Sequence, residues 1–288
     1  DLAKSSQSIY RSKLMVVGFE NVGKTTLLDC LFPLENKIKA RNFTGGNSEY
    51  YFILEGKHLK QYYEGELYKQ YILENKEWTV TKKIQKELFH EKKDLGIKIE
   101  RIKKPKKIKL YFEDEETRNL WFEKISRLVV NKATHGIEVN THVWKDSTLN
   151  QHQYQNIKIK QNEKKEKKDK DEYVDFSTWD FAGQNDYYNT HHYFLSNRSI
   201  FLVLYRMDQK IKGLESLDFW LKSLSTHLNQ NYCDEKGKPL YSIIIVGTFL
   251  DLIDDQSEDR KSKVMEIYDK NGLKSPPFYF EVSCSTLE

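Results

Sequence analysis

Residues 16–26 read Val-Val-Gly-Phe-Glu-Asn-Val-Gly-Lys-Thr-Thr, and their types and spacing suit them to bind phosphate. Glycines let backbone N–H groups approach phosphate oxygens, because a Cβ would block them. Lys24 would reach the β and γ phosphates of a nucleotide, and the Thr25 hydroxyl would ligate Mg²⁺. The alternative is a chance glycine turn before a helix. The predicted phosphate-binding residues are Gly18, Asn21, Val22, Gly23, Lys24, Thr25 and Thr26.

The elements around this loop favour the phosphate-binding interpretation. An apolar run at 14–17 predicts a buried strand before the loop, and a helical pattern follows at 26–32. A helix in that place points its positive dipole end at the same phosphate oxygens. Strand, glycine loop and helix in this order are the context that the motif requires.

A second segment predicts what happens to the bound phosphate. Residues 173–184 run from an alternating strand into Asp180-x-x-Gly183-Gln184. Asp180 would hold Mg²⁺ through water, the Gly183 N–H would meet a γ-phosphate, and Gln184 would orient a water molecule for hydrolysis. Asp-x-x-Gly alone is a common turn. Its position after the phosphate loop is what favours a role in hydrolysis.

Two later positions favour guanine as the base. The apolar strand at 242–248 leads to Asp251, whose carboxylate would accept hydrogen bonds from the guanine N1–H and exocyclic amine. Adenine has no such donor pair, which would leave the carboxylate unpaired. A backbone amide at Ser283 or Cys284 would meet the guanine O6. The alternatives are a helix cap at Asp251 and a plain polar turn at Ser283.

With these motifs the chain resembles the Ras-like GTPases, and among them the Roc domain of Roco proteins. The matching stretches are Tyr10-x-x-Lys13-Leu14-Met15-Val16-Val17-Gly18, residues 179–184 with Tyr187-Tyr188-x-Thr190-His191-x-x-Phe194-Leu195, and Val246-Gly247-Thr248-x-Leu250-Asp251. The resemblance implies a guanine-nucleotide switch that binds GTP or GDP with Mg²⁺ and hydrolyses GTP slowly. It also implies that Thr134, at the end of switch I, closes over Mg²⁺ and the γ-phosphate.

The chain also departs from the family pattern. Thr248 and Phe249 stand where Ras-like proteins usually carry Asn and Lys, although Phe249 would still stack on a purine. No arginine finger is identifiable, so the resemblance implies that a partner or dimerisation supplies any missing group. The first residue is Asp and the chain stops just after Ser285. We therefore expect a fragment of a longer protein, followed by the COR region through which Roco proteins form homodimers.

Composition sets the outer bounds. Of 288 residues, 38% are hydrophobic, and the mean hydropathy of −0.75 describes a highly charged surface. No apolar run reaches the roughly 18 residues of a membrane span. Cys30, Cys233 and Cys284 are widely spaced and fit reduced thiols in the cytosol, so we expect a cytoplasmic protein, with peripheral membrane binding left open. The His191-His192 pair favours packing over a metal site.

Residues 36–131 differ from the rest and predict an inserted domain between the phosphate-loop helix and switch I. They hold 22 Lys and Arg against 15 Asp and Glu, a net +7, whereas the remainder is −3. Patterns predict hairpins at 50–63 and 97–112 and a helix capped by Asp114. The apolar face of that helix is Leu120, Trp121, Ile125, Leu128 and Val129. This order resembles a pleckstrin-homology domain, a small β-barrel plus helix with a core tryptophan at Trp121.

The insert supplies the rival to the switch hypothesis. Lys103-Lys104-Pro105-Lys106-Lys107 would attract anionic headgroups at roughly 1 kcal/mol per lysine, or would be a solvated turn without a ligand. Binding of another protein is an equally open alternative. The absence of aromatic residues between the lysines disfavours binding of nucleic acid. The alternative protein is thus a non-catalytic nucleotide-binding scaffold whose basic insert docks membrane lipid or a protein. The Lys- and Glu-rich stretch 158–171 can bury nothing and predicts a solvated extension.

The expected fold class is α/β, a mostly parallel Ras-like sheet with helices on both faces. The GTPase domain comprises residues 1–35 and 132–288 and is interrupted by the insert. Continuous apolar strands such as Ser199–Tyr205 are typical of a parallel sheet covered on both faces. Ligands of such sheets bind at the carboxyl ends of the strands. The expected strands are 12–18, 136–145, 173–180, 199–205, 241–247 and 278–282, and the expected helices are 24–34, 213–229 and 257–271.

Overall fold

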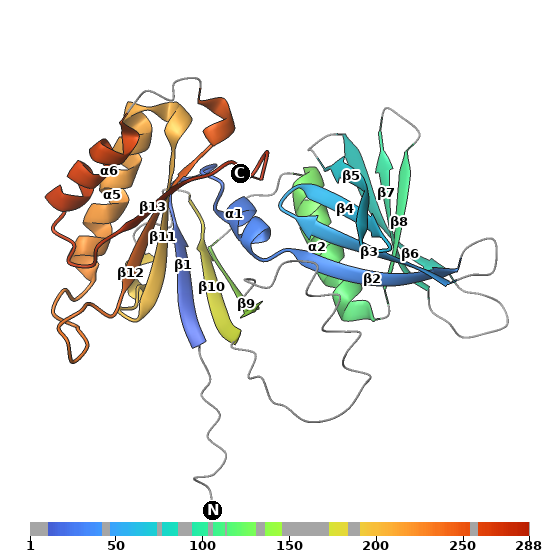
Figure 1. Cartoon of the computed structure of the whole chain (residues 1–288), viewed down its shortest axis with the longest axis horizontal. Coiled ribbons are helices and arrows are strands. Elements are labelled where there is room, and N and C mark those ends of the chain that lie inside the picture. Colours follow the sequence, from blue (N-terminus) through green and yellow to red (C-terminus); the bar gives the residue numbers. More distant parts are fainter. Residues whose placement is uncertain are drawn as a thin grey trace, which may run out of the picture. The chain divides into compact units, whose positions relative to one another are not determined.

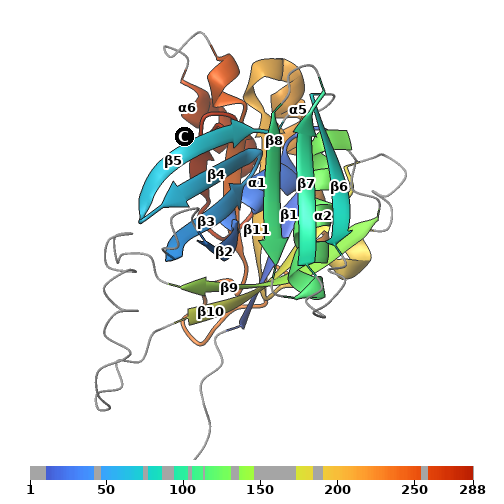
Figure 2. The same ribbon diagram turned by 90° about the vertical axis from the view of Figure 1, so that its right-hand side faces the viewer.

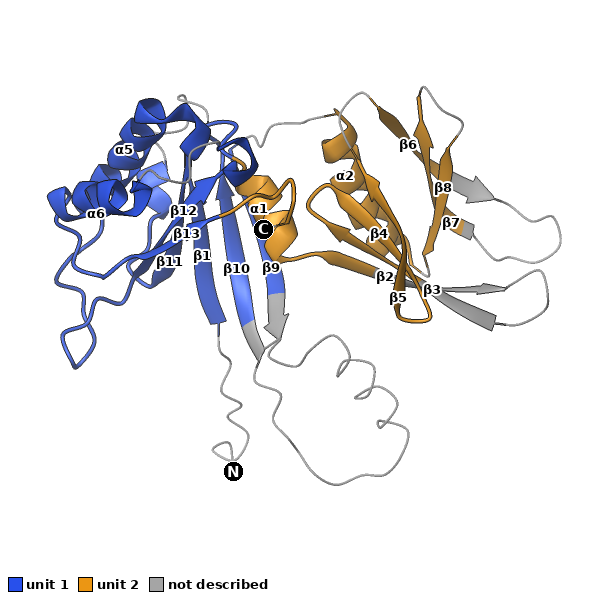
Figure 3. Ribbon diagram, turned by 45° about the horizontal axis from the view of Figure 1, so that its top comes forward, with its two compact units in different colours: residues 1–22, 135–281 blue, residues 23–134, 282–288 orange. Residues whose placement is uncertain are grey.

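The computed structural model describes ten stretches of the chain in two compact units. The described residues are 11–41, 47–73, 77–85, 94–102, 106–112, 114–130, 136–145, 173–183, 191–253 and 259–287. Unit 1 comprises Asp1–Val22 and His135–Glu281, and unit 2 comprises Gly23–Thr134 and Val282–Glu288 (Figure 3). The predicted limits of the two domains, at 35/36 and 131/132, stay predictions.

Unit 1 contains a six-stranded mixed sheet in the order β13-β12-β11-β1-β10-β9 (Figure 1). All neighbouring pairs are parallel except β10 with β9, so the predicted mostly parallel sheet is confirmed. β1 lies between β11 and β10, which makes its carboxyl end the point where the strand order reverses. The strands are β1 Arg11–Val17, β9 Ile137–Lys145, β10 Tyr173–Phe181, β11 Ser199–Arg206, β12 Ser242–Thr248 and β13 Phe278–Glu281.

Both faces of this sheet carry buried apolar side chains. Met15 and Val17 point to one face of β1, and Leu14 and Val16 to the other, because side chains alternate along a strand. The first face packs against α5 (Ile211–His227) and α6 (Arg260–Lys270), which contribute six buried residues to its core. These are Leu217, Trp220, Leu221, Leu224, Val264 and Tyr268. The described residues of unit 1 also include three short 3₁₀ turns: η3 His192–Phe194, η4 Met207–Gln209 and η5 Leu250–Leu252.

Unit 2 contains helix α1 (Lys24–Leu31), two antiparallel sheets and helix α2 (Glu115–Val130) (Figure 2). One sheet has the order β2-β3-β4-β5 and the other β6-β7-β8. The two predicted hairpins are confirmed as β3–β4 and β7–β8, whereas the sequence patterns did not define β2, β5 and β6. The strands are β2 Leu34–Arg41, β3 Asn47–Glu55, β4 His58–Tyr63, β5 Glu66–Ile72, β6 Trp78–Gln85, β7 Asp94–Arg101 and β8 Lys107–Phe112.

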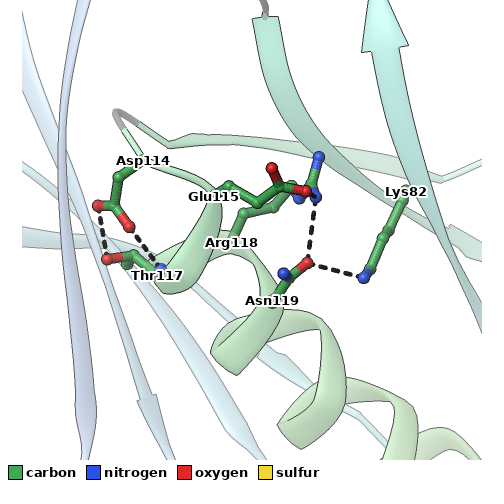
Figure 4. A network of polar contacts seen from close by, with 6 residues as sticks. All are labelled: Lys82, Asp114, Glu115, Thr117, Arg118 and Asn119. Atoms are coloured by element: carbon green, nitrogen blue, oxygen red, sulfur yellow. Dashed lines mark hydrogen bonds and ion pairs between the residues drawn. The ribbon is translucent and has the colours of Figure 1, made fainter.

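Helix α2 begins at the cap that the sequence predicts. The Asp114 carboxylate accepts from the Thr117 amide and from the Thr117 hydroxyl, both at 2.7 Å (Figure 4). Asn119 Oδ1 accepts from Lys82 Nζ at 2.7 Å and from Arg118 at 3.1 Å, which ties the helix to β6. These bonds satisfy the open first turn of the helix and fix its position beside the three-stranded sheet.

The core of the insert forms around one face of α2, on which the residues recur at intervals of three and four. Trp121, Ile125 and Val129 are buried, as the sequence predicts, and the Trp121 ring lies 5.8 Å from Phe112. The prediction for Leu120 is wrong, since it is 43% exposed. Arg118 occupies the buried face one turn earlier instead, and its guanidinium pairs with Glu115 at 2.5 Å.

No helix among the described residues is both long and apolar enough to cross a membrane.

Candidate functional site

In unit 1, three of the predicted site segments lie at the carboxyl ends of strands of the same sheet. Residues 18–22 follow β1, Asp180 is the penultimate residue of β10, and Thr248 ends β12. Asp180 pairs with Val16 of β1 in register and is 2% exposed. Parallel strands place such ends at one edge of a sheet, which is where α/β folds bind their ligands.

Thr248 braces the backbone of the phosphate loop. Its Oγ1 lies 2.9 Å from the Val22 carbonyl oxygen and 3.1 Å from that of Tyr205, and it donates its single hydrogen between them. The side chain is 3% exposed. The hydroxyl therefore joins β12, β11 and the loop, whereas the sequence analysis assigned Thr248 only to nucleotide binding.

We expect Thr248→Val to destabilise unit 1 by about 1–3 kcal/mol, because an isosteric methyl leaves two buried carbonyl oxygens without their donor. Urea unfolding followed by circular dichroism measures this loss. Thr248→Ser is the matched control, since it keeps the hydroxyl, and it should retain most of the stability. A larger loss in Thr248→Ser than in Thr248→Val would show that the methyl group, rather than the hydrogen bond, matters.

Gly183 packs against the backbone of the phosphate loop. A Cβ at this position would lie 2.5 Å from the carbonyl carbon of Phe19 and closer still to the amide nitrogen of Glu20. No side chain fits there unless one of the two backbones moves. The close approach explains the need for glycine two residues after the end of β10.

An aromatic cluster surrounds this contact and was missed by the sequence analysis. Phe19 stacks on Phe219 with ring centroids 5.3 Å apart and lies 6.3 Å from Trp220 of α5. His191 is 2% exposed, stacks on Trp220 at 5.8 Å and meets Phe181 edge-on at 4.8 Å. The preference for packing at His191 is thereby confirmed.

A pocket of about 460 Å³ lies on the α5 side of the loop. It is lined by Phe19, Glu20, Val22, Arg206, Gln209, Lys212, Glu215 and Ser216. The Arg206 guanidinium is 4.0 Å from the centroid of the Phe249 ring and covers one of its faces. Its two hydrogen bonds to Asp208, at 3.0 and 2.6 Å, raise the pKa of Arg206, which keeps the guanidinium charged. A purine would thus have only the opposite face of Phe249 for stacking.

In unit 2, the remainder of the loop caps helix α1. Gly23 is the N-cap with φ +91°, and its carbonyl accepts from the Leu27 amide at 2.8 Å. Lys24, the first helical residue, is 7% exposed, and Thr25 and Thr26 are half-buried. The loop therefore changes from turn to helix at the predicted position.

The predicted base-binding loop near the end of the chain also belongs to unit 2. Ser283 is 1% exposed, and its hydroxyl oxygen accepts from the amides of Ser285 and Thr286 at 3.2 Å each. Cys284 lies beside it and is half-buried. Asp251, assigned to the same base, lies exposed in η5 of unit 1.

Two predicted residues, Thr134 and Gln184, lie outside the described residues, as do the lysines at 103 and 104. Within the described stretches no group of three or more His, Cys, Asp or Glu is arranged to hold a metal. Of the predicted metal ligands, unit 1 supplies the Asp180 carboxylate and unit 2 the Thr25 hydroxyl, and both are oxygen donors. Such an oxygen set, with few protein ligands, is the kind that Mg²⁺ prefers.

Comparisons with known proteins find similarity to one family over part of the chain. Residues 131–251 match the family model described as "Ras of Complex, Roc, domain of DAPkinase". Probable serine/threonine-protein kinase roco5 of Dictyostelium discoideum is 34% identical over 116 residues, covering 39% of this chain and 4% of that protein. Leucine-rich repeat serine/threonine-protein kinase 1 of Caenorhabditis elegans is 39% identical over 80 residues, covering 28% of this chain and 3% of that protein.

The comparisons also found a third relative and a solved structure. Probable serine/threonine-protein kinase pats1 of Dictyostelium discoideum is 38% identical over 94 residues, 32% of this chain and 3% of that protein. The chain thus spans about 3–4% of the length of these relatives. A Roco2 RocCORdC structure from Methanosarcina barkeri, bound to GDP, aligns at 15% identity with a TM-score of 0.41, covering 98% of this chain and 46% of that one.

Proposed function

We propose that this chain is a guanine-nucleotide switch that binds GTP or GDP with Mg²⁺ and hydrolyses GTP slowly, as one part of a larger cytoplasmic signalling protein. The observation that carries the proposal is the phosphate-binding loop itself. β1 ends at Val17, α1 begins at Lys24, and the six residues between them hold both glycines of the motif. The Roc match over residues 131–251 supports the guanine assignment independently.

Each residue of the site has a defined part in binding. Lys24 neutralises charge on the β and γ phosphates, and backbone amides of the loop surround their oxygens. Thr25, Thr134 and Asp180 would hold Mg²⁺, the last through water, and the metal would neutralise negative charge on the phosphates. Asp251 accepts from the guanine N1–H and amine, and an amide at Ser283 or Cys284 donates to O6.

Hydrolysis and switching depend on two neighbouring groups. The Gly183 amide donates to the γ-phosphate, and Gln184 orients the attacking water. The close packing of Gly183 on Phe19 and Glu20 supports this part of the proposal, since it brings that backbone to the phosphate loop. Loss of the γ-phosphate would release Thr134 and Gly183 and change the conformation of the two segments that carry them.

Calorimetry with GDP, GTP and ATP tests the proposal as a whole. We expect heat with both guanine nucleotides in the presence of Mg²⁺, and displacement of labelled GTP by GTP but not by ATP. The nucleotide that copurifies with the protein gives a second measurement. No heat with either guanine nucleotide would refute the function, and equal competition by ATP would refute the role of Asp251.

We expect Gly183→Ala to lower the single-turnover rate of GTP hydrolysis by about 100-fold, because the new methyl displaces the amide from its place beside the loop and one preorganised donor is lost. Nucleotide affinity should change far less. Gly237→Ala strains the backbone, at φ +76°, but no atom lies within 4 Å of its added Cβ, so it controls for a general loss of stability and should leave the hydrolysis rate unchanged. An unchanged hydrolysis rate in Gly183→Ala would remove this amide from the chemistry.

The effect of Gln184→Leu separates the enzyme from the scaffold alternative. A leucine has no group to orient water, so we expect single-turnover hydrolysis to fall by about 10- to 100-fold while GTP binding persists. An identical rate in both proteins, or no hydrolysis in either, would favour a non-catalytic nucleotide-binding scaffold.

For the insert we propose a pleckstrin-homology-like fold. Support comes from antiparallel sheets of four and three strands followed by one helix with a central tryptophan. The scaffold alternative assigns lipid docking to the turn before β8, where Lys107 is 61% exposed and 3.4 Å from Glu100. Sedimentation with phosphoinositide vesicles tests it. Binding that survives glutamate at positions 103, 104, 106 and 107 would refute headgroup recognition there.

We also propose that the parent protein carries a COR region after this chain and forms homodimers. The Roco relatives support this, since the chain spans only a few per cent of their length. Dimerisation would supply the group that completes hydrolysis, because no arginine finger is identifiable in the sequence. Comparing hydrolysis by this chain with that by the longer protein tests the point.

A further inference from the structure

Three parts of unit 2 that are far apart in the sequence meet at one place. The Gly56 amide, in the β3–β4 turn, donates to the Asp29 carbonyl of α1 at 3.2 Å. His58 Nε2, at the start of β4, lies 2.9 Å from the Ser285 carbonyl oxygen. An ion pair between Asp29 and Lys124 holds α1 to α2. Helix α1, the turn and the loop at 283–286 therefore form one packed junction.

Two thiols lie within this junction. The Cys30 side chain, near the end of α1, lies beside Cys284, close enough that Cys284 raises the pKa of the Cys30 thiol. Gly56 packs over both, since a Cβ there would lie 2.7 Å from Cys30 Sγ and 4.0 Å from the Cys284 carbonyl oxygen. Both cysteines are half-buried, and neither is in a disulfide. Two thiols on segments that pack against the same glycine need only side-chain movement to reach the bonding distance of about 2.05 Å.

We propose that Cys30 and Cys284 are a redox-active dithiol, which hydrogen peroxide oxidises to an intramolecular disulfide. The Cys284 sulfur attacks peroxide, the O–O bond breaks, and a sulfenic acid and one water form. The Cys30 sulfur then attacks the Cys284 sulfur. The S–S bond forms, the S–O bond breaks, and the leaving hydroxide takes the Cys30 proton as a second water. Two thiols and one peroxide thus give one disulfide and two waters.

The order of the two attacks follows from the surroundings of Cys30. The neighbouring Cys284 side chain, together with burial and the nearby carboxylates of Glu55 and Asp29, raises the pKa of the Cys30 thiol. Cys30 therefore keeps its proton. Because a thiolate reacts with peroxide and a thiol does not, Cys284 is oxidised first and Cys30 resolves the sulfenic acid.

The disulfide would link the helix that follows the phosphate loop to the proposed base-binding loop. If the guanine-nucleotide site is as proposed above, this link restrains two nucleotide-binding segments and should slow GDP release. That consequence rests on the proposed function, whereas the formation of the disulfide does not. The two are therefore measured separately.

Peptide mapping of the peroxide-treated protein tests the disulfide directly. Trypsin should release residues 25–37 and 275–288 as one linked pair from the monomer band of a non-reducing gel, with Cys233 still alkylated. Cys233→Ser is the matched control and should form the same link. A link through Cys233, a link between two copies, or overoxidation without any link would overturn the proposal.

Two further variants test the order of attack. In Cys30→Ser the sulfenic acid has no resolving thiol, so we expect strong dimedone labelling at Cys284. In Cys284→Ser we expect at least fivefold weaker labelling at Cys30, and the reverse result would overturn the assignment.

Release of fluorescent GDP is then compared between reduced and oxidised protein. A disulfide with unchanged release leaves the dithiol intact and refutes only its effect on the nucleotide site.

Discussion

Replacing Lys24 by alanine is expected to weaken binding of GTP and GDP by roughly 100-fold, or about 3 kcal/mol, the largest effect that we expect on nucleotide affinity. Lys24 opens α1 and is 7% exposed, so its ammonium acts where water screens charge poorly. Alanine leaves the charge of the β and γ phosphates without that partner. Isothermal titration with GDP and GTP measures the loss.

The fold should survive this change, because alanine favours a helix at least as well as lysine. Circular dichroism checks that point. Lys222→Ala, on the exposed side of α5, removes the same charge away from the loop and should leave both affinities unchanged. If Lys24→Ala and Lys222→Ala bind GTP equally well, the glycine loop is not where the phosphates are held.

Trp121→Ala is expected to destabilise the insert by about 3–5 kcal/mol, the largest effect on stability. The indole is 1% exposed and packs with Phe112, Ile125 and Val129 between α2 and the strands. Truncation loses the transfer free energy of the ring and leaves a cavity that rigid strands cannot fill. Chemical unfolding monitored by circular dichroism should show an earlier transition.

The neighbouring residue of α2 provides the control for this experiment. Leu120→Ala removes a large apolar side chain from the same helix, but that side chain is 43% exposed. We expect its cost to stay below about 1 kcal/mol. Similar losses in both variants would mean that the core of the insert does not gather around Trp121.

Local patterns predicted most of the elements because they depend on neighbours in the chain. The continuous apolar runs of β1, β11 and β12 identified buried parallel strands, and the two hairpin patterns matched β3–β4 and β7–β8. The cap at Asp114 was equally local, since donor and acceptor are three residues apart. The strands β2, β5 and β6 have charged or polar residues among their apolar ones, so they showed no sustained alternation of apolar and polar residues.

The one wrong residue in the predicted insert core has the same explanation. Leu120 and Trp121 are adjacent, and both fit an apolar stripe drawn at helical spacing. Only the packing of α2 decides which side faces the strands, and that side includes Arg118 instead of Leu120. Arg118 can be buried here because Glu115 pairs with its guanidinium.

For the candidate site, the sequence by itself determined the phosphate loop, the strand-end Asp180 and the chemistry that their residue types permit. Only the tertiary structure decided that Thr248 braces Val22, that Gly183 packs on Glu20, and that Cys30 meets Cys284. Each of these pairs is separated by more than 160 residues. Motifs and periodicity report on residues that are close in the chain, whereas the register of the strands and the packing of turns bring distant ones together.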